Sequence, residues 1–308
     1  MRPASTAPGD PARTWAPAPR ISRSSRQASI TLGASAVATF GSAAQQARWA
    51  TPAGRGELLL AAALAEDEAD DPATPMTTAR ATDGGWLLTG TKTTVLAGTE
   101  AAVLLVPAST PSGVGVFAVA PDDAEVSVEP QQVTGGDGTA RVTFSGAFVP
   151  SDRLLGGTGS GAAGWLAARA TIGLCALQLG VAERALELTA AYARSREQFG
   201  KPIGSFQAVS QRLADGYIDV QGMRLTLWQA AWRLAEGLPA GMELATAKFW
   251  AAEGGYRVAH TAVHVHGGVG IDTDGDVHRY YAAATHNEFA LGGATAQLRR
   301  IGAALAAN

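Results

Sequence analysis

Residues 196–207 read REQFGKPIGSFQ and join two segments of helical pattern in a chain of 308 residues. Three residues that break helices, Gly200, Pro202 and Gly204, fall inside this stretch and end the first helix. Ser205 follows them, and because serine is a preferred N-cap, we expect it to cap a second helix that begins at the next residue. The stretch therefore predicts two long helices joined by a short turn.

The same stretch carries three side chains suited to a nucleotide. Arg196 offers a charge and a fork of donors for a phosphate, whereas Phe199 and Gln207 offer a ring and an amide for a planar heterocycle. This set fits a dinucleotide. Taken alone, the motif is also compatible with an ordinary turn between helices that binds nothing.

Composition restricts the partners and the compartment. A net charge of -3 gives no reason to expect nucleic acid or a membrane surface as a partner. No uncharged apolar run approaches the roughly 18 residues of a membrane span. Cys175 is the single cysteine and cannot form an internal disulfide, so we expect a reducing, cytoplasmic compartment.

The first part of the chain differs from the rest. Residues 1–28 hold five prolines, five arginines and one acidic residue, Asp10, and are predicted to be a disordered leader. Residues 29–55 have a loosely helical pattern that Gly41 and Ser42 break into two pieces. This segment is too short to be a domain.

Residues 56–156 show short runs of β type between turn residues. The clearest expected strands are 85–90, 102–106, 115–119 and 141–144. Regular turn signals between such runs predict an antiparallel barrel or sandwich.

From the glycine-rich linker at 156–164 onward, the pattern is helical to the end of the chain. Helices are expected over 165–196, 206–236, 242–264 and 277–307. On the second helix, the residues at helical spacing that should form the buried stripe are Val209, Leu213, Tyr217 and Val220. Four long helices with short links predict a four-helix bundle.

The motif at 196–207 closely resembles the flavin-contact motif of the acyl-CoA dehydrogenase family. Weaker local matches occur in the family's order: GS at 41–42 with QQ at 45–46, GWLLTGTK at 85–92, FVP at 148–150 and LLG at 154–156. The resemblance covers about residue 30 to the end of the chain.

This resemblance implies an α+β fold in three parts. They are a truncated N-terminal helical piece (29–55), an antiparallel β-barrel or sandwich domain (56–156) and a C-terminal four-helix bundle (157–308). It also implies FAD as cofactor, an acyl-CoA thioester as substrate and electron-transfer flavoprotein as a redox partner in a homo- or hetero-oligomer.

In the family, the motif of one subunit holds the adenosine and pyrophosphate end of the neighbouring subunit's flavin. The resemblance gives these roles to Arg196, Phe199 and Gln207. The sequence HVHGGVG at 264–270 looks like the family's glycine pair, which adds contacts from Gly267 and Gly268.

Three further positions are implied as flavin contacts. His264 stands where the family commonly has glutamine, and Thr295 and Gln297 survive in the terminal signature GGATAQLRR at 292–300. A metal at His264 and His266 is a disfavoured alternative, because side chains two residues apart near a helix end splay, and no metal site is predicted.

The family's catalytic glutamate is lost from that signature. Its position is Gly293, which cannot take the α-proton of a thioester. Some family members place the base on the first bundle helix, but its candidate region, 168–180, contains no carboxylate. The catalytic residue is therefore unknown, with Glu288 as a weak candidate five residues earlier.

The β side of the flavin pocket departs from the family as well. The loop AEDEADDP at 65–72 is acid-rich and glycine-free, which makes it a poor cradle for a flavin and its pyrophosphate. Thr93 follows Lys92 where the family usually has tryptophan. The β side of the subunit's own flavin pocket therefore departs from the family pattern, whereas the motifs that contact a neighbouring subunit's flavin are retained.

This asymmetry resembles the partner subunit of heteromeric acyl-CoA dehydrogenases of the steroid-degradation type, which lacks the base and shares a flavin site with a catalytic subunit. Two alternatives stay open. One is a homomeric dehydrogenase with a relocated base, and the other is a flavin-free scaffold or non-redox acyl-CoA protein.

Overall fold

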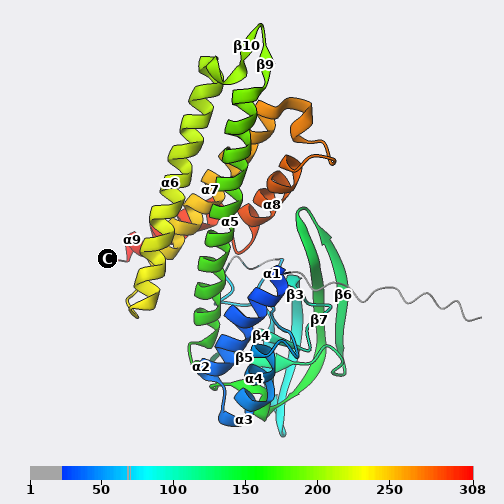
Figure 1. Ribbon diagram of the computed structural model, residues 1–308. Coiled ribbons are helices and arrows are strands. Elements are labelled where there is room, and N and C mark those ends of the chain that lie inside the picture. Colours follow the sequence, from blue (N-terminus) through cyan, green and yellow to red (C-terminus); the bar gives the residue numbers. More distant parts are fainter. Residues whose placement is uncertain (1–22, 68, 70, 308) are drawn as a thin grey trace, which may run out of the picture.

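The computed structural model describes residues 23–67, 69 and 71–307. Figure 1 shows a β-rich half and an elongated helical half, with helix α5 (Ala162–Ser195) running through both. Of the predicted disordered leader, residues 1–22 lie outside the described residues. Arg23–Ala28 form helix α1, which corrects the leader prediction for those six residues.

Short helical pieces follow α1 and cover one side of the sheet (Figure 1). They are α2 (Ser35–Phe40), α3 (Ala43–Gln45), α4 (Thr51–Gly54) and the π-helical stretches Ser29–Ala34 and Gln46–Ala50. The predicted break at Gly41 and Ser42 is confirmed. Ser42 caps α3 in a reciprocal capping box with Gln45, whose Nε2 also donates to the Asp152 carbonyl at 2.7 Å.

The sheet runs in the order β6-β7-β3-β2-β4-β5-β8, with β1 paired to β4. Its strands are β1 (Leu60–Ala62), β2 (Thr78–Thr82), β3 (Gly85–Leu96), β4 (Val103–Thr110), β5 (Gly113–Val119), β6 (Val126–Val133), β7 (Gly136–Pro150) and β8 (Leu154–Leu155). The four predicted strands are confirmed within β3, β4, β5 and β7. The sheet is mixed rather than purely antiparallel, because β1 and β2 both pair parallel to β4.

The helical half contains α5, α6 (Gln207–Ala235), α7 (Gly241–His266), α8 (Val277–Phe289) and α9 (Ala294–Ala306). The single helix predicted over 277–307 is wrong, because the chain turns between α8 and α9. Leu291 (φ 59°) and Gly292 (φ 90°) both adopt the left-handed conformation there, which a continuous helix does not allow.

The predicted buried stripe of α6 is partly wrong. Val220 is buried, but Tyr217 is 60% exposed, and the face that packs on the bundle is shifted along the helix. That buried face consists of Gly216, Asp219, Val220, Met223, Leu227 and Ala230. Asp219 is tolerated inside because Arg257 on α7 binds both of its carboxylate oxygens, at 2.5 and 2.9 Å.

Helix α5 joins the two halves by contributing to two cores. Its first part, including Leu166, packs with Trp49, Leu105 and Leu155 of the β-rich half. Its second part, including Leu179, packs with α6 and α7 in the bundle. By length and composition α5 could cross a membrane, but its buried faces in both cores are those of a central helix of a packed protein.

Candidate functional site

The predicted turn at 196–207 forms a two-stranded hairpin at the far end of α5. Strand β9 (Glu197–Gln198) pairs antiparallel with β10 (Lys201–Pro202). Phe199 (φ 53°) and Gly200 (φ 76°) are the two turn residues, and two positive φ values in succession match a tight hairpin turn.

The predicted role of Ser205 as a helix cap is wrong. Its hydroxyl donates to the Pro202 carbonyl at 2.7 Å, inside a 3-10 turn, and no side chain caps α6, whose N-cap is Phe206. The hairpin places the serine one residue too early to reach the free amides of the helix. Its hydrogen bond stabilises the return of the chain instead.

The side chains predicted to bind a nucleotide face outward at this hairpin. Arg196 uses its backbone amide and carbonyl for bonds to Tyr192 and Ile203, and its side chain is exposed, as is that of Gln207. Phe199 is 92% exposed and meets the ring of Phe206 edge to face, with ring centroids 6.1 Å apart. A large ring held in solvent on a tight turn suits contact with another molecule.

The glycine pair lies at the same end of the bundle. The ring of His266, near the end of α7, stacks on Tyr192 in the last part of α5, with centroids 4.3 Å apart. Gly267 and Gly268 follow in an exposed 3-10 helix, and a Cβ on either would meet open space. His264 is exposed one turn earlier. The structure thus gathers these residues with Arg196 at one end.

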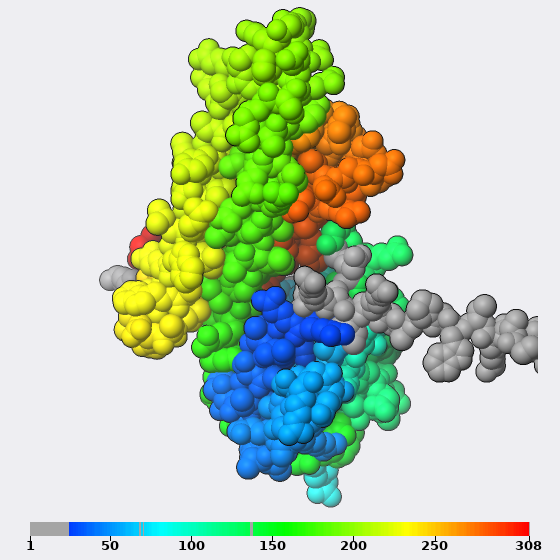
Figure 2. Space-filling view, in the orientation of Figure 1, coloured from blue at the N-terminus to red at the C-terminus, as the bar shows by residue number. Residues whose placement is uncertain are grey.

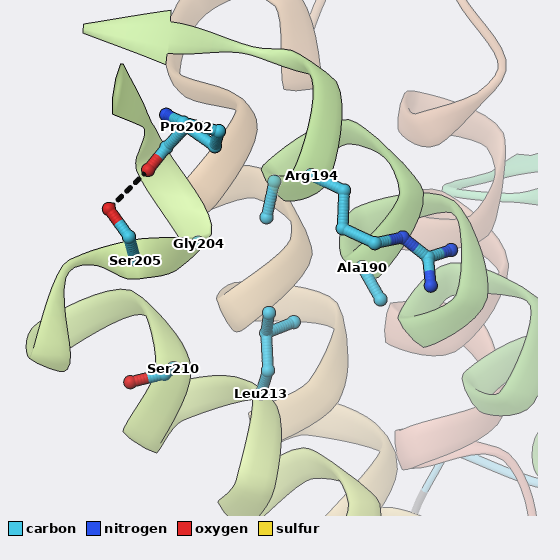
Figure 3. A pocket seen from close by; sticks show the side chains of 8 residues that line it. Ala190, Arg194, Pro202, Gly204, Ser205, Ser210 and Leu213 are labelled. Carbon is cyan, nitrogen blue, oxygen red and sulfur yellow. Dashed lines mark hydrogen bonds between the residues drawn. The ribbon is translucent and has the colours of Figure 1, made fainter. Parts of the chain in front are cut away.

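A shallow hollow of about 390 Å³ lies behind the hairpin, between α5 and α6 (Figure 3). It is lined by Ala190, Ala193, Arg194, Pro202, Gly204, Ser205, Ser210 and Leu213. None of the residues predicted to bind FAD is among them. Arg194 adds a cation to Arg196 and Lys201 at this end of the bundle, and the sequence did not indicate it because it belongs to no motif.

The terminal signature lies elsewhere, in the turn between α8 and α9. Gly293 is the N-cap of α9, and Thr295 is exposed in its first turn. Gln297 is fully buried, and its Nε2 donates to the carbonyls of Leu291 and Gly292 at 3.3 and 3.0 Å. In this chain, the amide of Gln297 therefore holds the turn together.

Glu288 is half-buried in the last turn of α8, next to Gly293. Its carbonyl oxygen would lie 3.6 Å from a Cβ placed on Gly293. Burial raises the pKa of Glu288, and the neighbouring Glu253 raises it further, whereas Lys248 opposes the shift. The structure therefore brings the backbone of the weak catalytic candidate close to the position of the lost glutamate.

A buried polar cluster beneath this turn was not foreseen from the sequence. Lys248 of α7 is completely buried, and its Nζ donates to the carbonyls of Asn287 and Glu288 at 3.2 and 3.0 Å. Burial lowers the pKa of Lys248 to about 8. Gln178 of α5 accepts a bond from the Asn287 amide at 2.9 Å. Together these contacts fix the end of α8 against α5 and α7.

On the β side, the acid-rich loop is tied inward by a buried ion pair. Lys92 Nζ lies 2.6 Å from Glu66 Oε1, and both side chains are almost fully buried. The hydroxyl and amide of Thr77 and the amide of Met76 also donate to Glu66. Burial raises the pKa of Glu66, but the hydrogen bonds from Lys92 and Thr77 outweigh it and leave the pKa below its ordinary value.

Two further acidic residues of the loop, Asp67 and Asp71, also form ion pairs. Asp67 binds Arg141 of β7 at 3.0 Å beside a hollow of about 230 Å³, and Asp71 lies 3.7 Å from Arg300 of α9. The Arg300 contact brings the terminal signature next to the β domain. The acidic charges that predict a poor flavin cradle are thus partly neutralised by the chain itself.

The predicted site residues fall into two groups at opposite ends of the bundle. The hairpin group consists of Arg196, Phe199, Gln207, His264, Gly267 and Gly268, and the turn group consists of Glu288, Gly293, Thr295 and Gln297. Helix α5 separates the hairpin from the β domain, and its 34 residues correspond to about 50 Å. Figure 1 shows the hairpin and the sheet at opposite ends of the molecule. One protomer therefore does not bring the two groups onto one ligand.

Within residues 23–67, 69 and 71–307, no group of three or more His, Cys, Asp or Glu side chains could hold a metal ion. His264 is exposed, and the Nδ1 atom of His266 lies 2.8 Å from the Ala262 carbonyl.

Known proteins resemble this chain over most of its length. Residues 157–306 match the family described as acyl-CoA dehydrogenase, C-terminal domain. The acyl-CoA dehydrogenase FadE27 of Mycobacterium tuberculosis is 52% identical over 90% of this chain and 75% of its own.

Two solved structures share the fold closely. The crystal structure of the ChsE4-ChsE5 complex from Mycobacterium tuberculosis has a chain with 53% identity and a TM-score of 0.86, matched over 91% of this chain and 75% of that one. The Tcur3481-Tcur3483 steroid ACAD G363A variant has 40% identity and a TM-score of 0.84, over 90% and 74% of the two chains. Together with the arrangement of the hairpin, the sheet and the bundle, these matches show that the chain belongs to the acyl-CoA dehydrogenase family.

Proposed function

We propose that this chain is a subunit of a heteromeric acyl-CoA dehydrogenase and that it completes the FAD site of a catalytic partner subunit. The reaction is the α,β-dehydrogenation of an acyl-CoA thioester. The observation that carries the proposal is the separation of the two groups. The anchoring side chains face outward at the hairpin, whereas α5 takes part in the core of the β-rich half only as far as Ala170, about 38 Å of helix before its end at Ser195.

The hairpin residues fit the nucleotide end of FAD. Arg196 presents an exposed guanidinium for the pyrophosphate, and the open backbone at Gly267 and Gly268 allows close approach of a phosphate or ribose. Phe199 presents an exposed ring that can stack on a heterocycle. Proteins of this family bind FAD, which accepts the hydride from the β-carbon of the substrate when bound.

The chain's own chemistry is anchoring and orientation rather than proton transfer. Gly293 offers no group that removes a proton, so the carboxylate that abstracts the α-proton comes from the partner subunit. Arg196 and Gln207 hold the cofactor, and the neutralised loop around Glu66 shapes the chain's own β surface. The remaining flavin contacts proposed for this chain are His264 and Thr295, whereas the amide of Gln297 already binds the carbonyls of Leu291 and Gly292.

The relatives support a heteromeric assembly and a steroid substrate. The name of the ChsE4-ChsE5 structure describes a complex of two different proteins, and that of the second structure describes a steroid ACAD. We extend both properties to this chain, with electron-transfer flavoprotein as the electron acceptor. A cytoplasmic location is part of the proposal, since the buried free thiol of Cys175 suits a reducing compartment.

The test is to purify the chain alone and together with the acyl-CoA dehydrogenase encoded beside it. We expect little FAD and no dehydrogenation from the chain alone. In the complex we expect about one FAD per pair of subunits, and activity on an acyl-CoA. Stoichiometric FAD with full activity in the lone chain would contradict the proposal.

One observation favours a second candidate function, a homomeric dehydrogenase whose base is Glu288. The backbone of Glu288 lies beside Gly293, and burial raises the pKa of its half-buried side chain, in the direction that favours a general base. Replacing Glu288→Gln in an active preparation separates the candidates. The second requires a loss of activity by a factor of about 100 or more, whereas the first requires little change.

A further inference from the structure

Helix α7 carries a buried lysine that has no ion-pair partner. Lys248 is completely buried, and its Nζ donates to two neutral oxygens, the carbonyls of Asn287 and Glu288, at 3.2 and 3.0 Å. None of the ion pairs within residues 23–67, 69 and 71–307 includes Lys248. By contrast, the equally buried Lys92 lies 2.6 Å from the carboxylate of Glu66. A buried charge held only by neutral groups costs free energy, so stability alone does not explain this lysine.

The pKa of Lys248 agrees with this cost. Burial lowers the pKa from its ordinary value of 10.5 to about 8. The charges of Cys175 on α5 and Glu288 on α8 act to raise the pKa, and Arg300 on α9 lowers it further, but burial has the largest effect. Glu253, on the same helix as Lys248, raises the pKa of Glu288 in turn. Because the folded chain holds the proton of Lys248 less tightly than the unfolded chain does, the charge lowers the stability at neutral pH.

The two carbonyls that Lys248 binds lie at the end of α8. The last four carbonyls of a helix have no amide partner within the helix. In α8, the first of the four, on His286, accepts a bond from the amide of Ala290 at 3.1 Å, and the last, on Phe289, accepts one from the amide of Gly292 at 3.2 Å. Lys248 takes the two between them. Since the partial charge of the backbone is negative at this end of a helix, the ammonium suits the position and completes the C-terminus of α8.

The turn that follows α8 has a strained backbone. Leu291 adopts the left-handed conformation (φ 59°), which a residue with a bulky side chain keeps only where its surroundings impose it. From the α9 side, Gln297 Nε2 donates to the carbonyls of Leu291 and Gly292 at 3.3 and 3.0 Å. Lys248 holds the other side, immediately before the turn. The turn is therefore fixed by an amide after it and by an ammonium before it.

From these contacts we infer that Lys248 is a positioning residue for the dehydrogenation: its ammonium fixes the end of α8 and thereby places the α8–α9 turn and Thr295 in the first turn of α9. The inference rests on the proposed function, in which Thr295 contacts the flavin. It applies as well if Glu288 is the base, because Lys248 binds the carbonyl of that residue. Since its side chain is completely buried, Lys248 acts through the turn and not on the reacting atoms.

Neutral contacts keep α8 docked when the ammonium is removed. Gln178 of α5 donates to the Ala284 carbonyl at 3.2 Å and accepts a bond from the Asn287 amide at 2.9 Å. Gly255 of α7 makes room for this side chain, because a Cβ there would lie 1.9 Å from Gln178 Nε2. Figures 1 and 2 show α8 beside α5 and next to the β-rich half. We therefore expect a Lys248→Met chain to fold, with the flexible methionine in the space of the lysine stem.

The first measurement is the melting temperature of the full chain. Lys248→Met removes a charge that costs stability, so at pH 7 we expect it to melt above the wild type or no more than about 3 °C below it. From pH 7 to 10 this difference should shift in favour of the wild type, which loses its buried charge above a pKa of about 8. Lys92→Met is the matched contrast, because it breaks an ion pair and should melt well below the wild type. A larger fall for Lys248→Met, including failure to fold, would overturn the inference.

The second measurement is hydrogen exchange of the turn in the same full chain at pH 7. In Lys248→Met we expect the amides of Ala290 and Gly292 to lose protection by a factor of about ten or more, because the charge-assisted bonds before the turn are gone. Strand β4 is the internal control, since it lies in the β domain and should exchange as in the wild type. Unchanged protection of the turn would overturn the inference.

The third measurement is kcat in the assembly that carries the dehydrogenase activity, whether that is the chain alone or its complex. We expect Lys248→Met to lower kcat by about tenfold or more, because a displaced contact at the reacting centre is costly. An unchanged kcat with a loosened turn would show that Lys248 does not position the site. Which assembly is active tests the proposed function, whereas the ratio of variant to wild type tests this inference, so the two failures are distinguishable.

Discussion

The polar side chains at the two ends of the helical bundle differ in exposure and in bonding. At the hairpin end, Arg196 and Gln207 extend into solvent, and Phe199 is almost fully exposed. At the end near the β domain, Glu66 is buried against Lys92, Asp67 binds Arg141 and Gln297 binds backbone carbonyls. One end offers its side chains to another molecule, whereas the other uses them to hold its own loops.

This difference shows that two motifs that both resemble flavin-binding sequences can differ in what their residues do in the structure. A residue that matches a ligand-binding motif contributes to binding only where its polar atoms are not already engaged within the chain. The hairpin group meets this condition, while Gln297 does not. Variants at the two ends should therefore separate into effects on binding and effects on stability.

The largest effect is expected at the buried ion pair. Lys92→Met removes the cation beside Glu66 and leaves a carboxylate buried without its partner, which should lower the free energy of unfolding by about 3–5 kcal/mol. Chemical denaturation measures this loss. Arg141→Met breaks the more exposed pair with Asp67 and is the control, with an expected loss below about 1 kcal/mol. Equal losses would show that burial does not distinguish the two pairs.

At the hairpin end, Arg196→Ala should weaken FAD binding by the complex with its catalytic partner without affecting folding. Losing a charge-assisted hydrogen bond costs about 1.5–3 kcal/mol, or about tenfold to a hundredfold in the dissociation constant. The dissociation constant of FAD is measured by following flavin fluorescence as the complex is diluted.

Arg194→Ala is the matched control for Arg196, because it removes the same charge two residues earlier from the same helix end. We expect both variants to unfold within about 0.5 kcal/mol of the wild type. Undiminished FAD retention by Arg196→Ala would remove the main support for the proposed anchoring role.

Acid should weaken the end near the β domain through Glu66. Its pKa in the folded state lies below the ordinary value of 4.5, so its contribution is fully present above that pH and is lost as pH falls through the folded pKa. The difference in unfolding free energy between the wild type and Glu66→Gln should therefore be constant from pH 7 to about 5 and shrink below that. If this difference in unfolding free energy grows toward low pH instead, the pKa of Glu66 is raised in the folded state and not lowered.

The smallest effect is expected at Gly293. Its φ of -74° is ordinary for any residue, and a Cβ there meets nothing closer than 3.6 Å, so Gly293→Glu should change stability by less than about 1 kcal/mol. Gly135→Ala is the contrast, because its φ is +68° and a Cβ would lie 2.2 Å from the Ala282 carbonyl. If the two variants melt alike, sterics do not decide tolerance at these turns.

Much of the fold followed from local sequence patterns. The alternating apolar runs predicted the central strands, and the glycine and proline signals located the boundaries of α5, α6 and α7 to within a few residues. The features that local patterns did not predict depend on tertiary contacts. The break between α8 and α9 depends on Leu291 in a left-handed conformation, which a leucine rarely adopts and which Gln297 holds in place from the next helix.

The site was predictable where it depends on motif position and not where it depends on pairing across the fold. Arg196, Phe199 and Gln207 were predicted from the residue types of their motif and from the family resemblance, and His264, Gly267 and Gly268 from the resemblance. The bond between Glu66 and Lys92 joins residues 26 apart, and the contacts of Lys248 join α7 to residues about 40 further on. No local pattern marks such pairs, so the acidic loop was interpreted by its composition only.

Helix α5 has a mechanical consequence. It is one uninterrupted helix anchored in both hydrophobic cores, through Leu166 at one end and Leu179 further along. A rigid rod fixed in two places behaves as a lever, so a force applied by a neighbouring protein at the hairpin is transmitted as a tilt of the whole β domain. Binding of a protein at the hairpin and the orientation of the β domain are therefore mechanically linked, because α5 has no hinge between its two anchored parts.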